Sequence, residues 1–247
     1  VPPDVARLYG PHVLKELAGL REEITRVQPE GDQDTLWMVF SSLLTKFSNQ
    51  RADSSSEEVE RRIRKGLVSE FFLRKTRELC ERWSRLEPEC TGPPPKLLCS
   101  DARDLHRRLP GRTRIDMILC SPPYGGTYDY SEHHRLRFAW LGLPLSGMQR
   151  HEIGARRNAQ GPESARRWHD ELGETLESMR RCLHPGAMAV LLMGDGELDG
   201  RRIPADIQVE ELAADTGFEP AAIASQSRPD RRGAADRKEH LMALRAR

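Results

Sequence analysis

The chain has 247 residues, which suits one large domain, or one domain with an added helical piece, and allows a sizeable core. Its 39 Lys and Arg against 38 Asp and Glu give a formal net charge of +1, which excludes a protein that attracts nucleic acid through a strongly basic overall field. No apolar run approaches the roughly 20 residues that span a bilayer, so no membrane partner is expected.

The cysteines and histidines do not indicate a metal site. The five cysteines lack the paired short spacings of zinc sites, and their odd number favours a reduced, cytoplasmic compartment over a disulfide framework. The adjacent His133 and His134 would point about 100° apart on a helix and could not share one ion. The sequence gives no indication of an oligomeric state.

The N-terminal part is predicted to be mainly helical. Residues 13–27, 32–47 and 69–86 place apolar side chains at helical spacing, with charged residues between them. Between the last two segments, residues 46–56 are polar and predict an exposed loop, with the next helix starting near Ser56. A solvated loop is the commoner explanation, but three side chains could contact nucleic acid: Lys46, Asn49 and Arg51.

A run of Thr-Gly-Pro-Pro-Pro at residues 91–95 is the best domain boundary in the chain. After it, the helical periodicity changes to alternating strands and helices. We therefore predict a helical insert over residues 1–92 and an α/β region over residues 93–247.

Two short apolar strands are predicted after this boundary. The first covers residues 96–100 and is followed by Asp101, which could cap a helix over residues 102–108. The second covers residues 115–120 and ends at Ser-Pro-Pro-Tyr-Gly-Gly, residues 121–126. Because prolines lack an N–H and fix φ, nearby carbonyls are not absorbed into a sheet ladder. The carboxyl end of a strand is also where open α/β sheets bind ligands.

The tetrapeptide Ser121-Pro122-Pro123-Tyr124 resembles motif IV of S-adenosylmethionine-dependent amino-methyltransferases, which carry Asp, Asn or Ser before Pro-Pro-Tyr or Pro-Pro-Phe. The resemblance implies that the Ser121 side chain and the Pro122 carbonyl accept hydrogen bonds from an exocyclic amine, while Tyr124 stacks on the base. It makes all four residues catalytic candidates and S-adenosylmethionine the cofactor. The alternative is a plain turn between two core elements.

The physical argument for such a site is independent of the resemblance. An aromatic amine is a poor nucleophile because its lone pair is delocalised into the ring. Two acceptors for its hydrogens favour a pyramidal nitrogen whose lone pair points at the methyl donor, so catalysis is mainly placement and electrostatics.

Residues 97–105 are similar to the third methyltransferase motif, in which an acidic residue after a strand binds the adenine amine of the cofactor. The resemblance implies cofactor contacts by Asp101 and its neighbour Ala102, together with Ser121 and Pro122. Helix capping explains Asp101 nearly as well, and both roles can hold together.

Substrate contacts are expected in the loop after the motif and in a basic segment downstream. Tyr128 and Tyr130 could extend a stacking surface for a base taken out of a duplex, although such tyrosines often only pack, and Gly125 is a further candidate for substrate contact. A helix is predicted over residues 131–140. Residues 146–167 have a local excess of positive charge, in which Arg156 and Arg157 are candidates for phosphate contact; a surface loop explains them equally well.

The remaining pattern is strand, helix and a terminal hairpin. After a helix over residues 165–182, the apolar run at 187–193 predicts a strand buried on both faces, ending in a Gly-Asp-Gly turn at 194–196. A helix over 206–216 and antiparallel strands over 219–227 and 239–244 follow. Five basic residues of this hairpin could form a second phosphate-contacting rim, with solvated charge slightly favoured: Arg228, Arg231, Arg232, Arg237 and Lys238.

The order of these elements resembles the Rossmann-like α/β sheet of class I methyltransferases. The Ser-Pro-Pro-Tyr region, the Gly-Asp-Gly turn and the Lys-Phe-Ser-Asn-Gln-Arg of the helical insert look like site-specific DNA methyltransferases of the cytosine-N4 or adenine-N6 type. The Gly-rich cofactor loop of that family is absent from this sequence. Its ordinary place is upstream of Val1, together with two central strands, so we expect a partial sheet that re-pairs or leaves open edges. We also expect weak binding of S-adenosylmethionine by this chain alone.

The function implied is methyl transfer to an exocyclic amine of a base in DNA. As the resemblance implies for Ser before Pro-Pro-Tyr, cytosine N4 is favoured over adenine N6, in keeping with a serine hydroxyl being a weaker acceptor and base than Asp. Two alternatives stay open: methylation of an RNA base, such as guanine N2, and a noncatalytic nucleic-acid-binding remnant. Methylation of a ring carbon is disfavoured, because it needs a nucleophilic Cys beside a Pro, and the sequence has no Pro-Cys pair.

Overall fold

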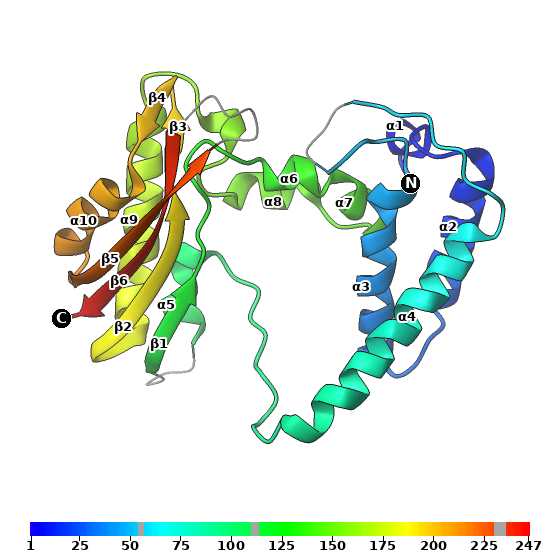
Figure 1. Ribbon diagram of the computed structural model, residues 1–247, viewed down its shortest axis with the longest axis horizontal. Helices are drawn as coiled ribbons and strands as arrows, with labels where there is room; N and C mark the ends of the chain where they lie inside the picture. Colours follow the sequence, from blue (N-terminus) through cyan, green and yellow to red (C-terminus); the bar gives the residue numbers. More distant parts are fainter. Residues whose placement is uncertain (54–56, 110–113, 230–235) are drawn as a thin grey trace. The chain divides into compact units, whose positions relative to one another are not determined.

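A computed structural model describes residues 1–53, 57–109, 114–229 and 236–247 (Figure 1). The chain divides into two compact units, one comprising Val1–Pro95 and Ser131–Arg150 and the other Lys96–Tyr130 and His151–Arg247. The second unit combines helices with a mixed sheet, so the predicted α/β class is confirmed. Among the described residues, no helix has the length and apolarity needed to cross a membrane.

The first unit is helical. Its elements are α1 (Pro3–Ala6), α2 (Pro11–Ile24), α3 (Glu30–Phe47), α4 (Leu67–Leu86), η1 (Glu87–Glu89), α6 (Tyr130–His133, beginning at the unit boundary), α7 (Arg135–Leu141) and α8 (Leu145–His151). The three predicted helices before the proline-rich run correspond to α2, α3 and α4, each within a few residues.

Residues 131–150 were expected in the α/β region, but they pack with the helical unit. Leu136 and Trp140 of α7 are buried in its core. The Trp140 ring meets the rings of Tyr9 and Phe40 edge to face, with centroids 5.6 and 5.8 Å apart. This segment belongs to the helical unit because its apolar side chains pack in the core of that unit. A single boundary near residue 93 could not predict that a later segment returns to the first unit.

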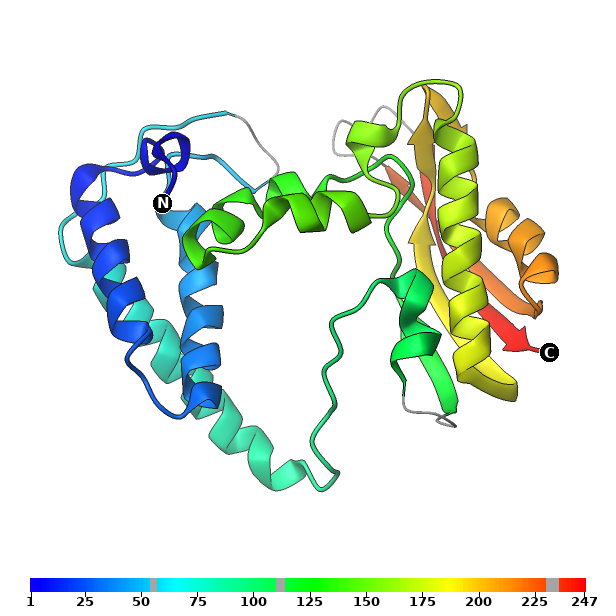
Figure 2. The same cartoon turned by 180° about the vertical axis from the view of Figure 1, so that it is seen from behind.

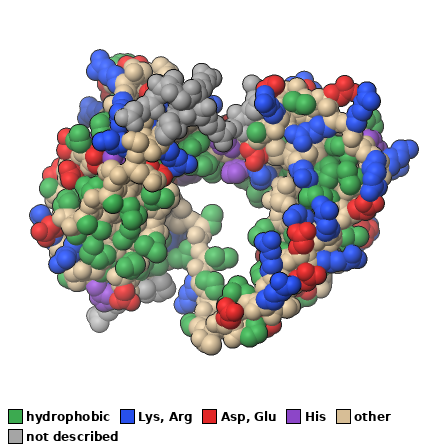
Figure 3. All heavy atoms as spheres, in the orientation of Figure 1, with side chains coloured by type: hydrophobic (Ala, Val, Ile, Leu, Met, Phe, Trp, Pro, Cys, Tyr) green, Lys and Arg blue, Asp and Glu red, His purple; other side chains and the backbone are tan. Residues whose placement is uncertain are grey.

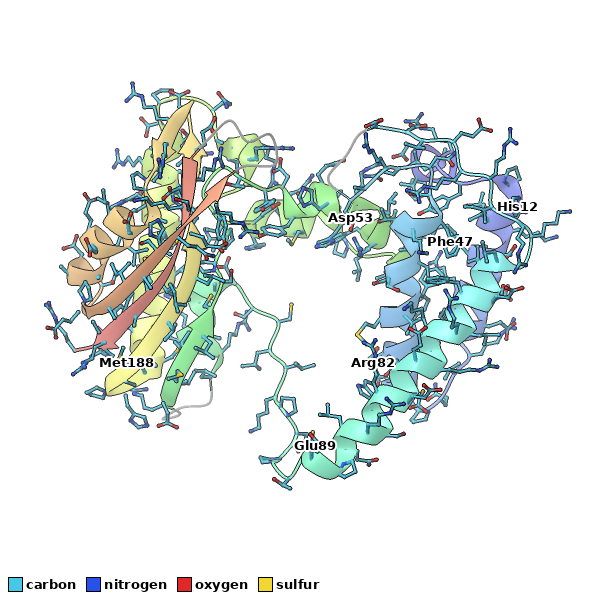
Figure 4. All side chains as sticks on the ribbon, viewed as in Figure 1. His12, Phe47, Asp53, Arg82, Glu89 and Met188 are labelled. Atoms are coloured by element: carbon cyan, nitrogen blue, oxygen red, sulfur yellow. The ribbon has the colours of Figure 1, made fainter. Side chains whose placement is uncertain are left out.

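The end of α3 and the loop that follows it are fixed by contacts with other residues of the helical unit. Phe47 packs edge-on against Phe71, and Asp53 accepts a hydrogen bond from Arg137 Nη2 at 3.1 Å (Figure 4 labels Phe47 and Asp53). Lys46 Nζ lies 4.5 Å from the Phe71 ring centroid, and Arg51 pairs with Glu57 at 2.7 Å. The helix predicted to start near Ser56 is wrong for the described residues, since none of residues 57–66 is helical. Ser56 itself lies outside the described residues.

The second unit contains a four-stranded sheet. Its elements are η2 (Ala102–Asp104), α5 (Leu105–Arg108), β1 (Ile115–Cys120), η3 (Arg156–Asn158), α9 (Ser164–Cys182), β2 (Leu183–Gly194), β3 (Gly196–Leu198), β4 (Arg201–Ile203), α10 (Ala205–Asp215), β5 (Phe218–Pro229) and β6 (Asp236–Ala246).

The strand order is β1-β2-β6-β5, in which β1 and β2 are parallel and the other two pairs are antiparallel. The predicted terminal hairpin is therefore confirmed. The small β3–β4 hairpin follows β2. Figure 2 shows α9 and α10 on one side of the sheet, where their apolar side chains form the core with Leu191, Met193 and Met242.

No described helix covers the other face of this sheet. This face exposes four large apolar side chains: Met117, Leu119, Leu192 and Leu241. Figure 3 shows hydrophobic side chains gathered on the visible face of this unit. The prediction that residues 187–193 are buried on both faces is therefore wrong. The predicted strand at residues 96–100 is also wrong, since these residues form no strand and Leu97 is 92% exposed. Among the described strands, β1 pairs with β2 alone, so the expected open edge is confirmed.

Replacing Leu119 by lysine should leave the stability nearly unchanged, because this side chain is 75% exposed. We expect a change in the free energy of unfolding within about 0.5 kcal/mol and less self-association, measured by urea denaturation and sedimentation. The control is Leu191→Lys on the neighbouring strand, which buries a charge in the core and should cost more than about 3 kcal/mol. Equal damage from both variants would show that the open face is covered in solution.

Candidate functional site

The loop that follows β1 carries the Ser-Pro-Pro-Tyr sequence. β1 ends at Cys120, which lies opposite Leu191 of β2 in parallel register. Ser121 is exposed, whereas Pro122 is buried and Pro123 is half-buried. The loop therefore leaves the carboxyl end of the strand with its serine open to solvent.

Two glycines allow this loop to pass close to its neighbours. A Cβ on Gly125 would lie 2.7 Å from Trp168 Nε1, and one on Gly126 would lie 2.0 Å from the carbonyl oxygen of Glu197. Gly126 also has a φ of +69°, which favours glycine. The Gly126 N–H donates to the Gly154 carbonyl at 2.9 Å, and the Gly125 carbonyl accepts from the Glu197 N–H at 3.0 Å. Gly125, predicted to contact substrate, is buried, and its visible role is to fix the shape of the loop.

Tyr124 is held at both ends of its side chain. Its hydroxyl donates to Glu239 Oε1 at 2.7 Å, and its ring lies over Gly194, where a Cβ would come within 2.6 Å of the ring. Burial, and then the Glu239 carboxylate, raise the pKa of Tyr124 to about 12, while a hydrogen bond with Ser121 opposes the shift. The phenol therefore keeps its proton at neutral pH and acts as a donor to Glu239.

The other two predicted tyrosines continue the aromatic surface. The Tyr128 ring centroid lies 6.3 Å from that of Tyr124 and 5.7 Å from that of Tyr130, with interplanar angles of 54° and 41°. Tyr128 is 40% exposed, more than either neighbour. The structure thus brings the three tyrosines into one row, with the most accessible ring in the middle.

The two arginines predicted to contact phosphate differ in their surroundings. Arg157 Nη1 donates to Glu152 Oε2 at 2.6 Å and to Asp129 Oδ1 at 3.1 Å. Glu152 also accepts from the Tyr130 backbone N–H at 2.5 Å, so Arg157 braces the tyrosine loop. Arg156 is exposed, and its Nε lies 3.7 Å from Asp129 Oδ2. Arg156 therefore presents its charge to solvent, whereas that of Arg157 is directed inward to carboxylates.

Asp101 caps the short helix η2. Helix capping was one of the two roles predicted for this residue. Its Oδ1 accepts from the Arg103 backbone N–H at 3.0 Å, and its carboxylate is bonded by the Arg103 guanidinium and by His151 Nδ1. The bond to Arg103 is the main reason that the pKa of Asp101 lies far below its usual range. Ala102 is the first residue of η2 and is exposed.

The described residues make up at most part of a pocket for S-adenosylmethionine. Asp101 borders a cavity of about 440 Å³, but that cavity is lined almost entirely by charged and polar side chains, including Arg103, His106 and Glu174. A pocket for an adenine ring is normally mostly apolar. Ser121 and Pro122 do not line this cavity, and the sequence has no Gly-rich loop. The described residues therefore bring together the side chains predicted to contact the base, but they show no mostly apolar pocket beside Asp101.

Comparisons with known proteins found similarity only among solved structures. No protein-family profile and no curated protein sequence matches the chain. A crystal structure of a protein from Thermus thermophilus, provisionally named a DNA modification methylase, matches at 19% identity and a TM-score of 0.36, over 60% of this chain and 50% of that one. The structure of the same protein complexed with S-adenosyl-L-methionine matches at 19% identity and a TM-score of 0.36, over 60% and 51%.

A third solved structure, of a SAM-dependent methyltransferase from Methanosarcina mazei, matches at 13% identity and a TM-score of 0.25, over 32% of this chain and 52% of that one. The chain thus spans about half the length of the solved structures that it matches.

Sequence reasoning assigned no role to Glu239, although this residue holds Tyr124. Glu239 also pairs with Arg228, one arginine of the predicted basic rim. A second arginine of that rim, Arg237, pairs with Glu197 at 2.6 Å. Arg231 and Arg232 lie outside the described residues. The available signal was a carboxylate at the start of the predicted strand over residues 239–244, just before its apolar run.

A buried polar cluster below this edge of the sheet was also missed. Asp195, in the Gly-Asp-Gly turn, accepts from Arg202, from the backbone N–H groups of Lys238 and Ala205, and from His240 Nε2 at 3.2 Å. Asp195, Asp206 and His240 place ligand atoms within 4.8 Å of one another, the spacing of a metal site. Because Asp195 already has Arg202 as its counter-charge, the cluster is satisfied by protein groups. Its visible role is to fasten β2, β4, α10 and β6 together.

Proposed function

We propose that this chain binds a base of DNA and presents its exocyclic amine for methylation. Cytosine N4 is the favoured acceptor and adenine N6 the alternative. The proposed cofactor is S-adenosylmethionine, which supplies the methyl group when bound. The observation that carries the proposal is the loop at the end of β1, where an exposed Ser121 stands beside a Tyr124 ring held in one orientation.

The proposed roles follow from the chemistry of these groups. The Ser121 hydroxyl and the Pro122 carbonyl accept hydrogen bonds from the two amine hydrogens, which directs the nitrogen lone pair away from the base plane. The row of tyrosines offers rings on which an extruded base can stack, a contact worth roughly 1–3 kcal/mol per base. Tyr124 and Tyr128 are the proposed stacking residues, and Arg156 is the proposed phosphate contact.

Methylation of an amine is also supported by the state of the nearest thiol. Cys120 immediately precedes Ser121, and burial raises its pKa. A neutral thiol is a weak nucleophile. The enzyme class that forms a covalent bond to a ring carbon needs a thiolate, so Cys120 does not favour that chemistry.

The test is transfer of labelled methyl groups from S-adenosylmethionine to plasmid DNA or to total RNA by the complete gene product. We expect label in DNA, and we expect Tyr124→Ala to lower transfer roughly 5- to 150-fold, as the loss of 1–3 kcal/mol of stacking implies. Thermal unfolding of the variant is the control for folding. Label in RNA alone would support the RNA methyltransferase, and salt-sensitive binding without transfer would support the noncatalytic remnant.

A further inference from the structure

We infer that Glu239 is a positioning residue, which sets the orientation of the Tyr124 ring. Glu239 lies on β6, and β2 separates it from β1, the strand that leads into the Tyr124 loop. Its effect on methyl transfer rests on the proposed function, whereas its effect on the Tyr124 side chain does not.

The sheet register places Glu239 under the Tyr124 loop. On β6, Glu239 lies opposite Gly194 of β2 and Gln226 of β5. Because Gly194 has no side chain, the Tyr124 ring crosses β2 at this point and its hydroxyl reaches the next strand. The Tyr124 side chain, which comes from a loop, is thereby hydrogen-bonded to β6, an inner strand of the sheet.

Glu239 is itself fixed. It is only 8% exposed, and its carboxylate accepts from the Tyr124 hydroxyl, from Gln226 Nε2 at 3.3 Å and from Arg228 Nη1. The Tyr124 hydrogen bond, together with Arg228, lowers the pKa of Glu239 despite the desolvation that raises it. Glu239 is therefore an anion at neutral pH, and hydrogen bonds to an ionised acceptor are roughly twice as strong as neutral ones.

The geometry of the ring follows from these two contacts. A tyrosine side chain on a loop can turn about two torsions. The close approach of the ring carbons to Gly194 restricts rotation of the ring, and the hydrogen bond to Glu239 fixes the position of the hydroxyl. A fixed plane is what stacking on a base requires, so Glu239 would act on the base through Tyr124 without touching it.

The first test is an ultraviolet titration of the tyrosines in Glu239→Gln, with Tyr124→Phe to assign the Tyr124 signal. Glutamine keeps the size of the side chain but removes its charge. We expect the pKa of Tyr124 to fall from about 12 toward its ordinary value of 10.0, because the anion no longer opposes loss of the phenol proton. The control is Glu197→Gln, which removes another carboxylate paired with an arginine and should leave the titration unchanged. An unchanged Tyr124 pKa in Glu239→Gln would overturn the inference.

The second test measures methyl transfer by the complete gene product. We expect Glu239→Gln to lower kcat about tenfold with little change in KM for DNA, and to have no further effect in a Tyr124→Phe background. A loss that persists undiminished in the Tyr124→Phe background would overturn the positioning role. If the Tyr124 pKa shifts as expected but no variant or wild-type protein transfers methyl groups, the proposed function fails while the positioning of Tyr124 stands.

Discussion

Replacement of Asp195 by alanine should lower the free energy of unfolding by about 3–5 kcal/mol. The Asp195 side chain is almost fully buried, and it receives hydrogen bonds from Arg202, His240 and two backbone N–H groups. Alanine would leave these donors without an acceptor and a guanidinium without its counter-charge. Chemical denaturation of the 247-residue chain measures the loss.

The stabilisation by Asp195 should depend on pH. Burial raises the pKa of Asp195, but the backbone N–H groups of Lys238 and Ala205, with Arg202 and His240, lower it overall. Because the folded-state pKa lies below the unfolded value of about 3.9, the stabilisation is fully present above pH ~4 and is lost as the pH falls through the folded-state pKa. The difference in stability between the wild type and Asp195→Asn should therefore shrink in acid.

Asp116 provides the matched control. Its side chain is 99% exposed on β1, so Asp116→Ala should change the stability by less than about 0.5 kcal/mol. An equally small effect of Asp195→Ala would mean that the buried cluster does not hold the sheet edge.

Replacement of Gly194 by alanine should remove most of the proposed activity without unfolding the protein. The new Cβ would lie 2.6 and 2.8 Å from two carbons of the Tyr124 ring, closer than such atoms can approach. The ring must move, and its hydroxyl then leaves Glu239. We expect methyl transfer by the complete gene product to fall roughly ten- to a hundredfold, with the pKa of Tyr124 moving toward 10.0.

Gly19→Ala is the control for this substitution. Gly19 lies in α2, where a Cβ would meet nothing within 4 Å, so alanine should be neutral or slightly stabilising. If Gly194→Ala kept both full transfer and the high pKa of Tyr124, the ring would not be held between Gly194 and Glu239.

The sequence predicted the elements that depend on local pattern. The helices α2, α3, α4 and α9, the pair α6 and α7, the strands β1 and β2 and the terminal hairpin all have a clear apolar pattern, and each was predicted within a few residues, whereas α1 and α8 were not predicted. The loop after β1 was placed at the carboxyl end of a strand because two prolines and two glycines end an apolar run unambiguously.

Features that depend on a distant partner were not predictable. Residues 96–100 have the composition of a strand, but a strand needs a neighbour, and none of the described strands lies beside them. Arg157 has the same sequence signal as Arg156, yet only the fold reveals that Glu152 and Asp129 bind Arg157. Glu239 lies 115 residues from Tyr124, so their hydrogen bond could not be anticipated.

We propose that a base amine, and no other atom of the nucleic acid, is presented beside Ser121 and Tyr124. The most direct test of this proposal is mass spectrometry of the nucleosides released from unmethylated plasmid DNA after incubation with the complete gene product and S-adenosylmethionine. We expect N4-methylcytosine, or N6-methyladenine as the alternative. Methylation of a cytosine ring carbon, or no methylated nucleoside in DNA at all, would contradict it.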